Sequence, residues 1–307
     1  MPEGHSIHRL ARQFSDVFVG EKLAVSSPQG KFSAGAARLD GHVLENAAAH
    51  GKHLFLTFSH GTVLHIHLGL YGAWSFGGDG TFTGSSSIGA PRRVGERETF
   101  DDGADAGYDG PPPPVGAVRV RLVSGHGWAD LRGATTCAAL AGPEVQAVLD
   151  RLGPDPLHNR PGDRDEFVGR LRRRRTAVGQ LLMDQSVLAG VGNIYRAEAL
   201  FRHGVDPWLP GSSVPAATAG ELWDDAVLLM NDGVRHGRII TTPAEFWEPD
   251  GTGAASGGGM QLPADGQAHY VYKRQGQPCR VCGSSIGMAE MAARKLYWCP
   301  GCQAAHA

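Results

Sequence analysis

The chain has 307 residues, enough for about two domains, and 41% of them are hydrophobic, enough to bury a core. Lys and Arg number 29 against 31 Asp and Glu, so a net charge of −2 excludes a uniformly basic nucleic-acid-binding coat. No apolar run is long enough to cross a membrane and the first residues lack a signal-peptide pattern, so we expect a cytoplasmic protein without membrane contact.

The predicted elements change in type along the chain. Apolar residues between His5 and Phe18 recur at the spacing of one helical face, which predicts a short helix after the N-terminus. Short β-type runs follow Gly20, and strands at such close spacing favour a sandwich or barrel-like sheet. We expect these strands at 23–26, 42–47, 53–58, 62–67, 71–76, 117–123 and 128–131. In the fourth run, His65 and His67 are expected to be inward-facing strand residues rather than metal ligands.

From about residue 143 the apolar spacing becomes helical, which predicts a second domain. The boundary falls near 133–152, where a linking helix ends in a Pro-containing turn. The expected organisation is an N-terminal β domain at 1–132, a linker at 133–152, a helical domain at 153–268 and a C-terminal tail at 269–307.

Two segments differ in composition from the rest. Residues 77–115 contain 22 Gly, Ser, Pro or Asp and predict a flexible insert, and residues 241–268 predict a mobile loop without Lys or Arg. The other 240 residues carry 26 basic and 20 acidic side chains. The neutral total therefore hides a basic body, which favours a polyanionic partner.

The strongest chemical signal is the pair of C-x-x-C motifs near the end of the chain. Cys279, Cys282, Cys299 and Cys302, with sixteen residues between the pairs, have the number and spacing of a tetrahedral zinc site. Four thiolates leave no open coordination position, so we expect one structural Zn²⁺ in a β-hairpin finger. Five basic residues against one acidic residue in the tail favour phosphate contact, although a finger that only stabilises the domain or holds a protein partner fits equally well.

A second signal is the run from Leu181 to Phe201, in which two helical patterns flank a Gly-rich turn. Asn193 can cap the second helix, and a helix N-terminus presents N–H groups that bind phosphate. Five arginines among the six positions 170–175 are, taken alone, a solvated face.

The N-terminus is the third signal. Once the initiator Met is removed, Pro2 presents a secondary amine of low basicity, which can attack a sugar aldehyde carbon and form an iminium. Glu3 stands beside it as a proton donor. Lys52 lies in a turn between two predicted strands.

Four motifs occur together and in order: MPEG, GKHLF, LMDQ…AGVGNIYRAE and CRVCG…RKLYWCPGCQ. The chain resembles the bacterial Fpg/Nei DNA glycosylases over nearly its whole length apart from the two loops. Within that family it is most similar to the endonuclease VIII (Nei) branch, in particular the second Nei-type paralogue of actinobacteria.

The resemblance implies an α+β multidomain fold: an N-terminal helix with a two-layered β-sandwich, and a helix-two-turn-helix domain with a Cys₄ zinc-finger β-hairpin. By resemblance, Pro2 is the nucleophile, Glu3 the acid, and Lys52 a lysine that supports base excision. Asn193 and Arg294 match the residues that grip the phosphates flanking the lesion. The implied partner is damaged DNA with its lesion flipped out of the stack, bound by a monomer that needs no catalytic metal or organic cofactor.

Leu70 and Tyr71 match the residues that in Nei enzymes fill the space left by the flipped base, whereas Gly69 departs from a polar residue there. The match favours excision of oxidised pyrimidines, and the family resemblance implies strand cleavage by β,δ-elimination. Two alternatives stay open: the same chemistry on oxidised purines, and a non-catalytic zinc-containing DNA-binding protein.

Overall fold

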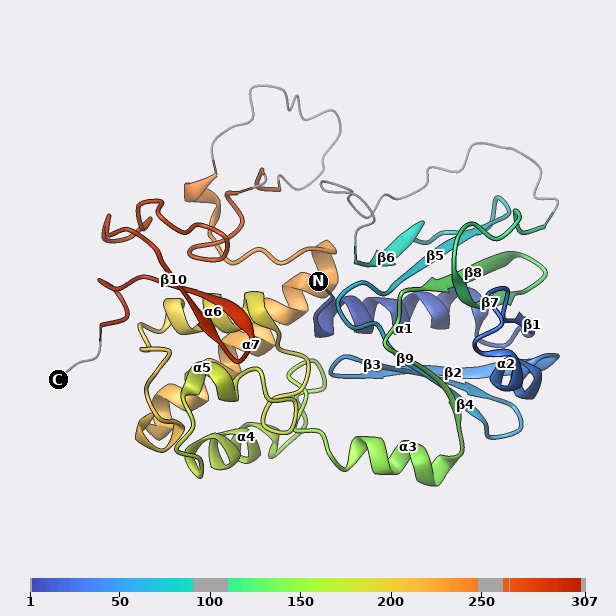
Figure 1. Cartoon of the computed structure of the whole chain (residues 1–307), viewed down its shortest axis with the longest axis horizontal. Helices are drawn as coiled ribbons and strands as arrows, with labels where there is room; N and C mark the ends of the chain where they lie inside the picture. Colours follow the sequence, from blue (N-terminus) through green and yellow to red (C-terminus); the bar gives the residue numbers. More distant parts are fainter. Residues whose placement is uncertain (1, 91–109, 248–261, 265, 305–307) are drawn as a thin grey trace. The chain divides into compact units, whose positions relative to one another are not determined.

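The computed structural model describes residues 2–90, 110–247, 262–264 and 266–304. About half of the predicted insert (91–109) and about half of the predicted loop at 241–268 (248–261 and 265) therefore lie outside the described residues. The chain divides into two compact units, Met1–Leu152 and Gly153–Ala307 (Figure 1). Within the described ranges, no helix is long and apolar enough to cross a membrane.

The first unit is built around helix α1 (Gly4–Phe18), whose apolar face is buried in the core. The Phe14 ring meets the Trp74 ring edge to face, with centroids 4.9 Å apart. The helix runs antiparallel to the second strand, because the Gly20 N–H donates to the Leu44 carbonyl (2.8 Å) and the Ser15 hydroxyl donates to the Ala47 carbonyl (3.5 Å).

The described strands of this unit form one antiparallel sheet of nine, ordered β6-β5-β8-β7-β1-β2-β3-β4-β9. The sheet folds into two layers with α1 between them (Figure 1), which confirms the predicted helix and two-layered sandwich. The strands are β1 (Lys22–Ser26), β2 (His42–His50), β3 (His53–Phe58), β4 (Val63–His67), β5 (Ala73–Gly78), β6 (Ser87–Gly89), β7 (Val118–Val123), β8 (Gly127–Arg132) and β9 (Thr136–Leu140).

Three elements of this unit differ from the prediction. Strand β6 lies in the predicted insert, strand β9 lies in the predicted linker, and helix α2 (Ser33–Leu39) was not predicted. Helix α3 (Gly142–Leu149) is the linking helix that the sequence predicted. Long-range contacts explain both strands: the Gln13 side chain bonds both backbone groups of Ser85 just before β6, and β9 pairs with β4. A periodicity search does not detect such short strands, which depend on tertiary pairing.

Histidines occupy the face of β3 and β4 that points away from the hydrophobic core. Leu64 and Ile66 belong to the core, and His65 and His67 alternate with them, so His65 is buried on the opposite face rather than toward the core as predicted. His53 and His65 share a 2.8 Å hydrogen bond between Nδ1 and Nε2, and their rings stack 5.1 Å apart. Burial, followed by the neighbouring His67, lowers the pKa of His53 to about 3 and that of His65 to about 4.

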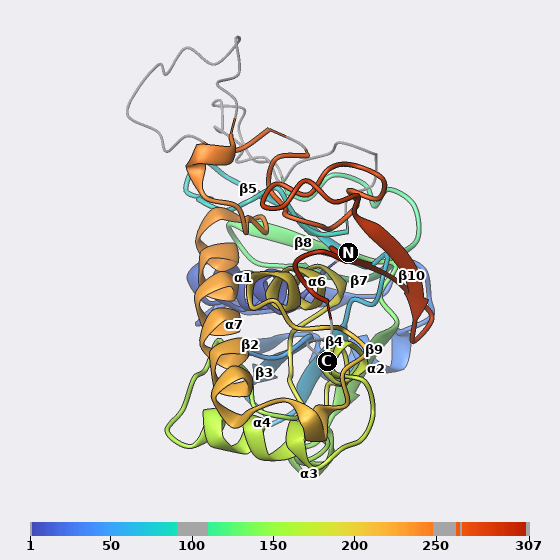
Figure 2. The ribbon, with the colours of Figure 1, turned by 90° about the vertical axis from the view of Figure 1, so that its left-hand side faces the viewer.

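The second unit is helical, with α6 (Asn193–Arg202) at its centre. One side of α6 packs into a core with Trp223 and Leu222, and the other packs through Ala197 and Phe201 on the finger. In Figure 2, α7 runs along one side of this unit. The other elements are α4 (Asp163–Arg172), α5 (Val178–Leu181), α7 (Ala216–His236), two 3₁₀ turns (Gly211–Ser213 and Ala244–Phe246) and a hairpin of β10 (Gly287–Met291) and β11 (Arg294–Trp298).

The histidine face predicts a stability that depends on pH. Unfolded histidines take up protons below pH 6.5 whereas His53 and His65 stay neutral in the fold, so stability falls as the pH drops from 7 to 5. The loss should be about 1–2 kcal/mol per histidine at pH 5. We expect His65→Gln to reduce the difference between the melting temperatures at the two pH values.

The exposed His60 provides the matched control, since His60→Gln makes the same replacement at a histidine outside the buried face. Because both variants keep the cysteines, any acid-induced change at the finger cancels in the comparison. An equal effect of the two replacements would contradict the assignment of the pH dependence to the buried face.

Candidate functional site

The first described residues, Pro2 and Glu3, immediately precede α1. Both are buried, Glu3 completely, while the hydrophobic core cluster of this unit starts only at Ile7. Glu3 takes the N-cap position with an extended backbone, and its carbonyl accepts a hydrogen bond from the Ser6 N–H (3.0 Å). A carboxylate there is stabilised by the positive end of the helix dipole.

The start of α1 and Lys52 lie at the same end of the unit. From Ser15 back to Gly4 the helix rises about 16 Å, and from Ala47 to the end of β2 at His50 the strand advances about 10 Å before the turn that holds Lys52. Because α1 and β2 are antiparallel, the start of α1 and the end of β2 lie at the same edge of the unit, as Figure 1 shows. The fold therefore brings Pro2 and Glu3 to the end of the sheet that carries Lys52.

The turn after β4 lies at this same end, because His53 pairs with His67 across β3 and β4. Burial and then the Lys52 charge lower the pKa of His67, so the Lys52 charge lies near the His67 ring. The Gly69 N–H donates to His67 Nδ1 (3.2 Å) and fixes the start of the turn. Leu70 is half-buried and Tyr71 is 80% exposed, so the Tyr71 ring is presented to solvent.

The absence of a side chain at Gly69 has a local physical reason. Its backbone has φ of +67°, and a Cβ there would lie 2.4 Å from Thr135 Cγ2. A polar side chain at this position requires both a different backbone and a different neighbour.

In the second unit, the Gly-rich turn before α6 is held by Gln185. Its amide donates to the carbonyls of Met183 and Val191 (both 3.0 Å) and its Oε1 accepts from the Gly190 N–H (3.0 Å). These bonds span the turn and explain why a glutamine precedes it in the sequence. The second helix of the predicted helix-turn-helix is present as α6, whereas the first, predicted from Leu181 onward, is absent: α5 ends at Leu181 and residues 182–192 form turns and irregular chain.

Asn193 does not cap α6 with its side chain, contrary to the prediction, because the N-cap position belongs to Gly192. Instead, Asn193 Nδ2 donates to the Lys295 carbonyl on β11 (2.9 Å), and Oδ1 accepts from the fully buried Arg196 guanidinium. Arg196 also donates to the Gly179 carbonyl (3.3 Å). Two hydrogen bonds thus fix the orientation of the Asn193 amide. Its acceptor on the finger, Lys295, directly follows Arg294 in the sequence.

Glu198 is fully buried and binds the segment that leads into the finger. Its two carboxylate oxygens accept from the N–H groups of Tyr270, Val271 and Tyr272 at 2.7–2.9 Å and from the Thr241 hydroxyl at 2.5 Å. Four donors satisfy the buried charge, as such a group requires. The carboxylate therefore fixes the position at which the finger leaves the helical core.

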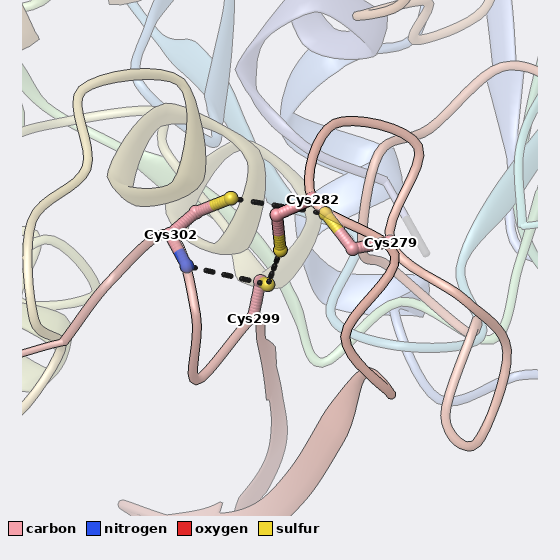
Figure 3. A group of neighbouring side chains, drawn as sticks. All are labelled: Cys279, Cys282, Cys299 and Cys302. Carbon is pink, nitrogen blue, oxygen red and sulfur yellow. Dashed lines mark hydrogen bonds between the residues drawn. The ribbon is translucent and has the colours of Figure 1, made fainter.

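The four predicted cysteines come together, two from each side of the hairpin (Figure 3). Their sulfur atoms all lie within 4.8 Å of one another, with Cys282 and Cys299 Sγ 3.3 Å apart and Cys279 and Cys302 Sγ 3.9 Å apart. Four thiolates each about 2.3 Å from one ion would be separated by about 3.8 Å. This donor set fits a structural Zn²⁺.

Three family models match the chain in order. The N-terminal domain of formamidopyrimidine-DNA glycosylase matches residues 1–126, its H2TH domain matches 152–244, and the zinc finger found in FPG and IleRS matches 276–305. Endonuclease 8 1 of Mycobacterium tuberculosis is 41% identical over 303 residues, which cover 99% of this chain and 100% of that protein. The chain belongs to the Fpg/Nei family of DNA glycosylases.

Other relatives agree. Probable endonuclease 8 2 of Streptomyces coelicolor is 29% identical and covers 99% of this chain and 94% of its own, a lower identity than that of the mycobacterial protein. The crystal structure of MutM (Fpg) from Thermus thermophilus has a TM-score of 0.67 at 25% identity over 98% of both chains. The fold also matches the Lactococcus lactis Fpg in complex with abasic-site DNA, at TM-score 0.71 and 17% identity, over 98% of this chain and 99% of that one.

The protein is therefore a DNA glycosylase and abasic-site lyase of base excision repair, with a structural zinc finger. Sequence reasoning did not identify three residues that organise the second unit: Gln185, Arg196 and Glu198. All three lie within the motif used for the resemblance, but their polarity gave no signal of burial.

The buried Glu198 predicts a strong effect of a small change. Glu198→Gln keeps the shape but replaces one acceptor oxygen by an NH₂ group that faces backbone N–H donors, so we expect a loss of about 2–5 kcal/mol. Thermal unfolding, together with the rate at which a chelator removes zinc, measures the effect. Glu221→Gln on α7, where the side chain is 58% exposed, is the control and should change neither. Equal behaviour of the two variants would contradict the anchoring role.

Proposed function

We propose that this enzyme removes oxidised pyrimidines from DNA through a Schiff base formed by Pro2 and then cleaves the strand by β,δ-elimination. The observation that carries the proposal is the position of Pro2 and Glu3, buried at the start of α1, at the edge of the unit that carries Lys52, in a chain of this family. This chemistry requires a weakly basic amine, a carboxyl group and a second cation close to the sugar.

In the proposed reaction, the free Pro2 amine attacks C1′, the bond from C1′ to the base breaks, and the proton lost by the amine passes to the departing base. Glu3 protonates the sugar ring oxygen, so the ring opens and an iminium joins Pro2 to C1′. The Glu3 carboxylate then takes a C2′ proton as the 3′ phosphate leaves, a second elimination expels the 5′ phosphate, and water hydrolyses the iminium and releases the sugar fragment. Every step uses protons and electron pairs of these groups, so we propose no catalytic metal or organic cofactor.

We assign the DNA contacts to both units. Asn193 Nδ2 keeps one N–H on the Lys295 carbonyl, and we propose that its second N–H donates to a phosphate next to the lesion, with Arg294 on the following phosphate. Leu70 and the exposed Tyr71 are proposed to fill the space left by the flipped nucleotide of a DNA bound by one monomer.

The first test traps the covalent intermediate. Borohydride added to the protein with abasic-site DNA should give an adduct whose peptide linkage maps to Pro2, and intact mass should show that Met1 is removed. A one-residue extension before Pro2 should abolish trapping, whereas the same extension at the C-terminus should not. Glu3→Gln should slow excision of a lesion base about 10²–10⁴-fold. Full trapping by the N-terminally extended protein would rule out the Pro2 amine.

The second test is a panel of duplexes with one defined lesion each, measured in single turnover. Oxidised pyrimidines should be excised at least tenfold faster than 8-oxoguanine or formamidopyrimidine lesions. The opposite order would move the substrate class to oxidised purines and leave the Schiff-base chemistry intact.

A further inference from the structure

The second unit contains a pocket of about 460 Å³ beside the finger hairpin. One wall comes from the segment between α4 and α6, with Arg174 and Asp184, and the other from the hairpin tip and Arg294. The remaining lining is Thr176, Gln180, Leu181, Met183, Ala292 and Ala293. Two guanidinium groups therefore reach one pocket from segments more than a hundred residues apart in sequence.

Arg174 is held in place by the protein. Its Nη1 donates to Asp184 Oδ2 (2.8 Å) and its Nη2 donates to the Ser186 hydroxyl (3.3 Å). The other Asp184 oxygen accepts from the N–H and hydroxyl of Ser186 (2.9 and 2.6 Å). The Asp184 lone pairs are thus directed into protein contacts, and a guanidinium with five N–H groups keeps further donors for a ligand.

The charges of the pocket favour an anion. Arg174 and Arg294 exceed the single Asp184 carboxylate by one positive charge, and Thr176 and Gln180 add neutral donors. Arginine is well suited to phosphate because its planar fork can donate two parallel hydrogen bonds. The pocket also has room for the sugars that flank a phosphodiester.

We propose that this pocket binds a backbone phosphate of the DNA strand, with Arg174 as a phosphate-binding residue opposite Arg294. The inference rests on the proposed function, since it adds a second cationic arm to the contact assigned to Arg294. It also distinguishes Arg174 from its neighbours, because all three arginines are exposed but Arg173 and Arg175 do not line the pocket.

The test uses a duplex that carries a tetrahydrofuran analogue of an abasic site, which cannot form a Schiff base. Arg174→Gln should weaken binding about tenfold, and the slope of log affinity against log salt should fall by about 0.9. Arg173→Gln and Arg175→Gln remove the same charge from adjacent positions and should change the affinity by less than threefold. Equal effects of the three replacements would overturn the proposal.

A second variant distinguishes the loss of the Arg174 hydrogen-bond donors from repulsion of the phosphate by the uncovered Asp184 carboxylate. Arg174→Gln leaves Asp184 facing the phosphate, so the double variant Arg174→Gln with Asp184→Asn should remain at least several-fold weaker than the wild type. Full recovery of affinity in the double variant would show that Arg174 only neutralises Asp184, which overturns the direct contact.

The contact can also be located on the DNA by replacing single phosphates with neutral methylphosphonates. A methylphosphonate at one position should weaken binding by the wild type but should not weaken binding by Arg174→Gln any further. Such coupling requires a direct interaction between that phosphate and Arg174. Additive losses at every position would contradict the proposal. Borohydride trapping by the wild type tests the proposed function separately, so a failure of the pocket leaves that result unaffected.

Discussion

The second unit depends on the full satisfaction of the Glu198 carboxylate. The free energy of burying a charge without partners far exceeds what one hydrogen bond contributes. The segment at 270–272 must therefore present its N–H groups to the Glu198 carboxylate. The finger packs on α6 through Ala197 and Phe201, and the other side of the same helix belongs to the helical core. One helix of ten residues therefore contributes to two hydrophobic cores and fixes their relative position.

The same helix organises the polar surface. Arg196, two residues before Glu198, ties Asn193 to the strand that follows the hairpin tip. An asparagine from a helical turn and an arginine from a zinc finger can act together only if the finger has a single orientation. The buried pair of opposite charges on α6 provides that orientation, and the metal fixes the finger itself.

The sequence predicted what is strongly patterned and local. The α1 periodicity, most of the long strands, the cysteine spacing and the hairpin were within reach, because each depends on a few residues of defined spacing. Strands β6 and β9 were not, because their residues are weakly apolar and are ordered by Gln13 and by β4. The cap assigned to Asn193 was wrong for a similar reason: a partner a hundred residues away takes its side chain.

Burial also changes the meaning of charged and polar residues. A sequence shows Glu198 as one more acidic side chain on a helix, and His65 as one more polar residue in an alternating strand. Only the fold shows that the first is enclosed by donors and that the second must stay neutral next to His53. Function-bearing positions follow from motif and chemistry, whereas the residues that orient them follow from packing.

The tip of the finger hairpin combines a strained backbone with small side chains that leave room for a ligand. Ala292 and Ala293 both adopt left-handed conformations, with φ of 52° and 55°, which cost alanine about 1–2 kcal/mol each and which Asn-Gly adopts more readily. Both side chains also line the pocket beside Arg294. A methyl group is the smallest side chain that still restricts the backbone of this loop, so the tip limits backbone freedom next to Arg294 and leaves the cavity open.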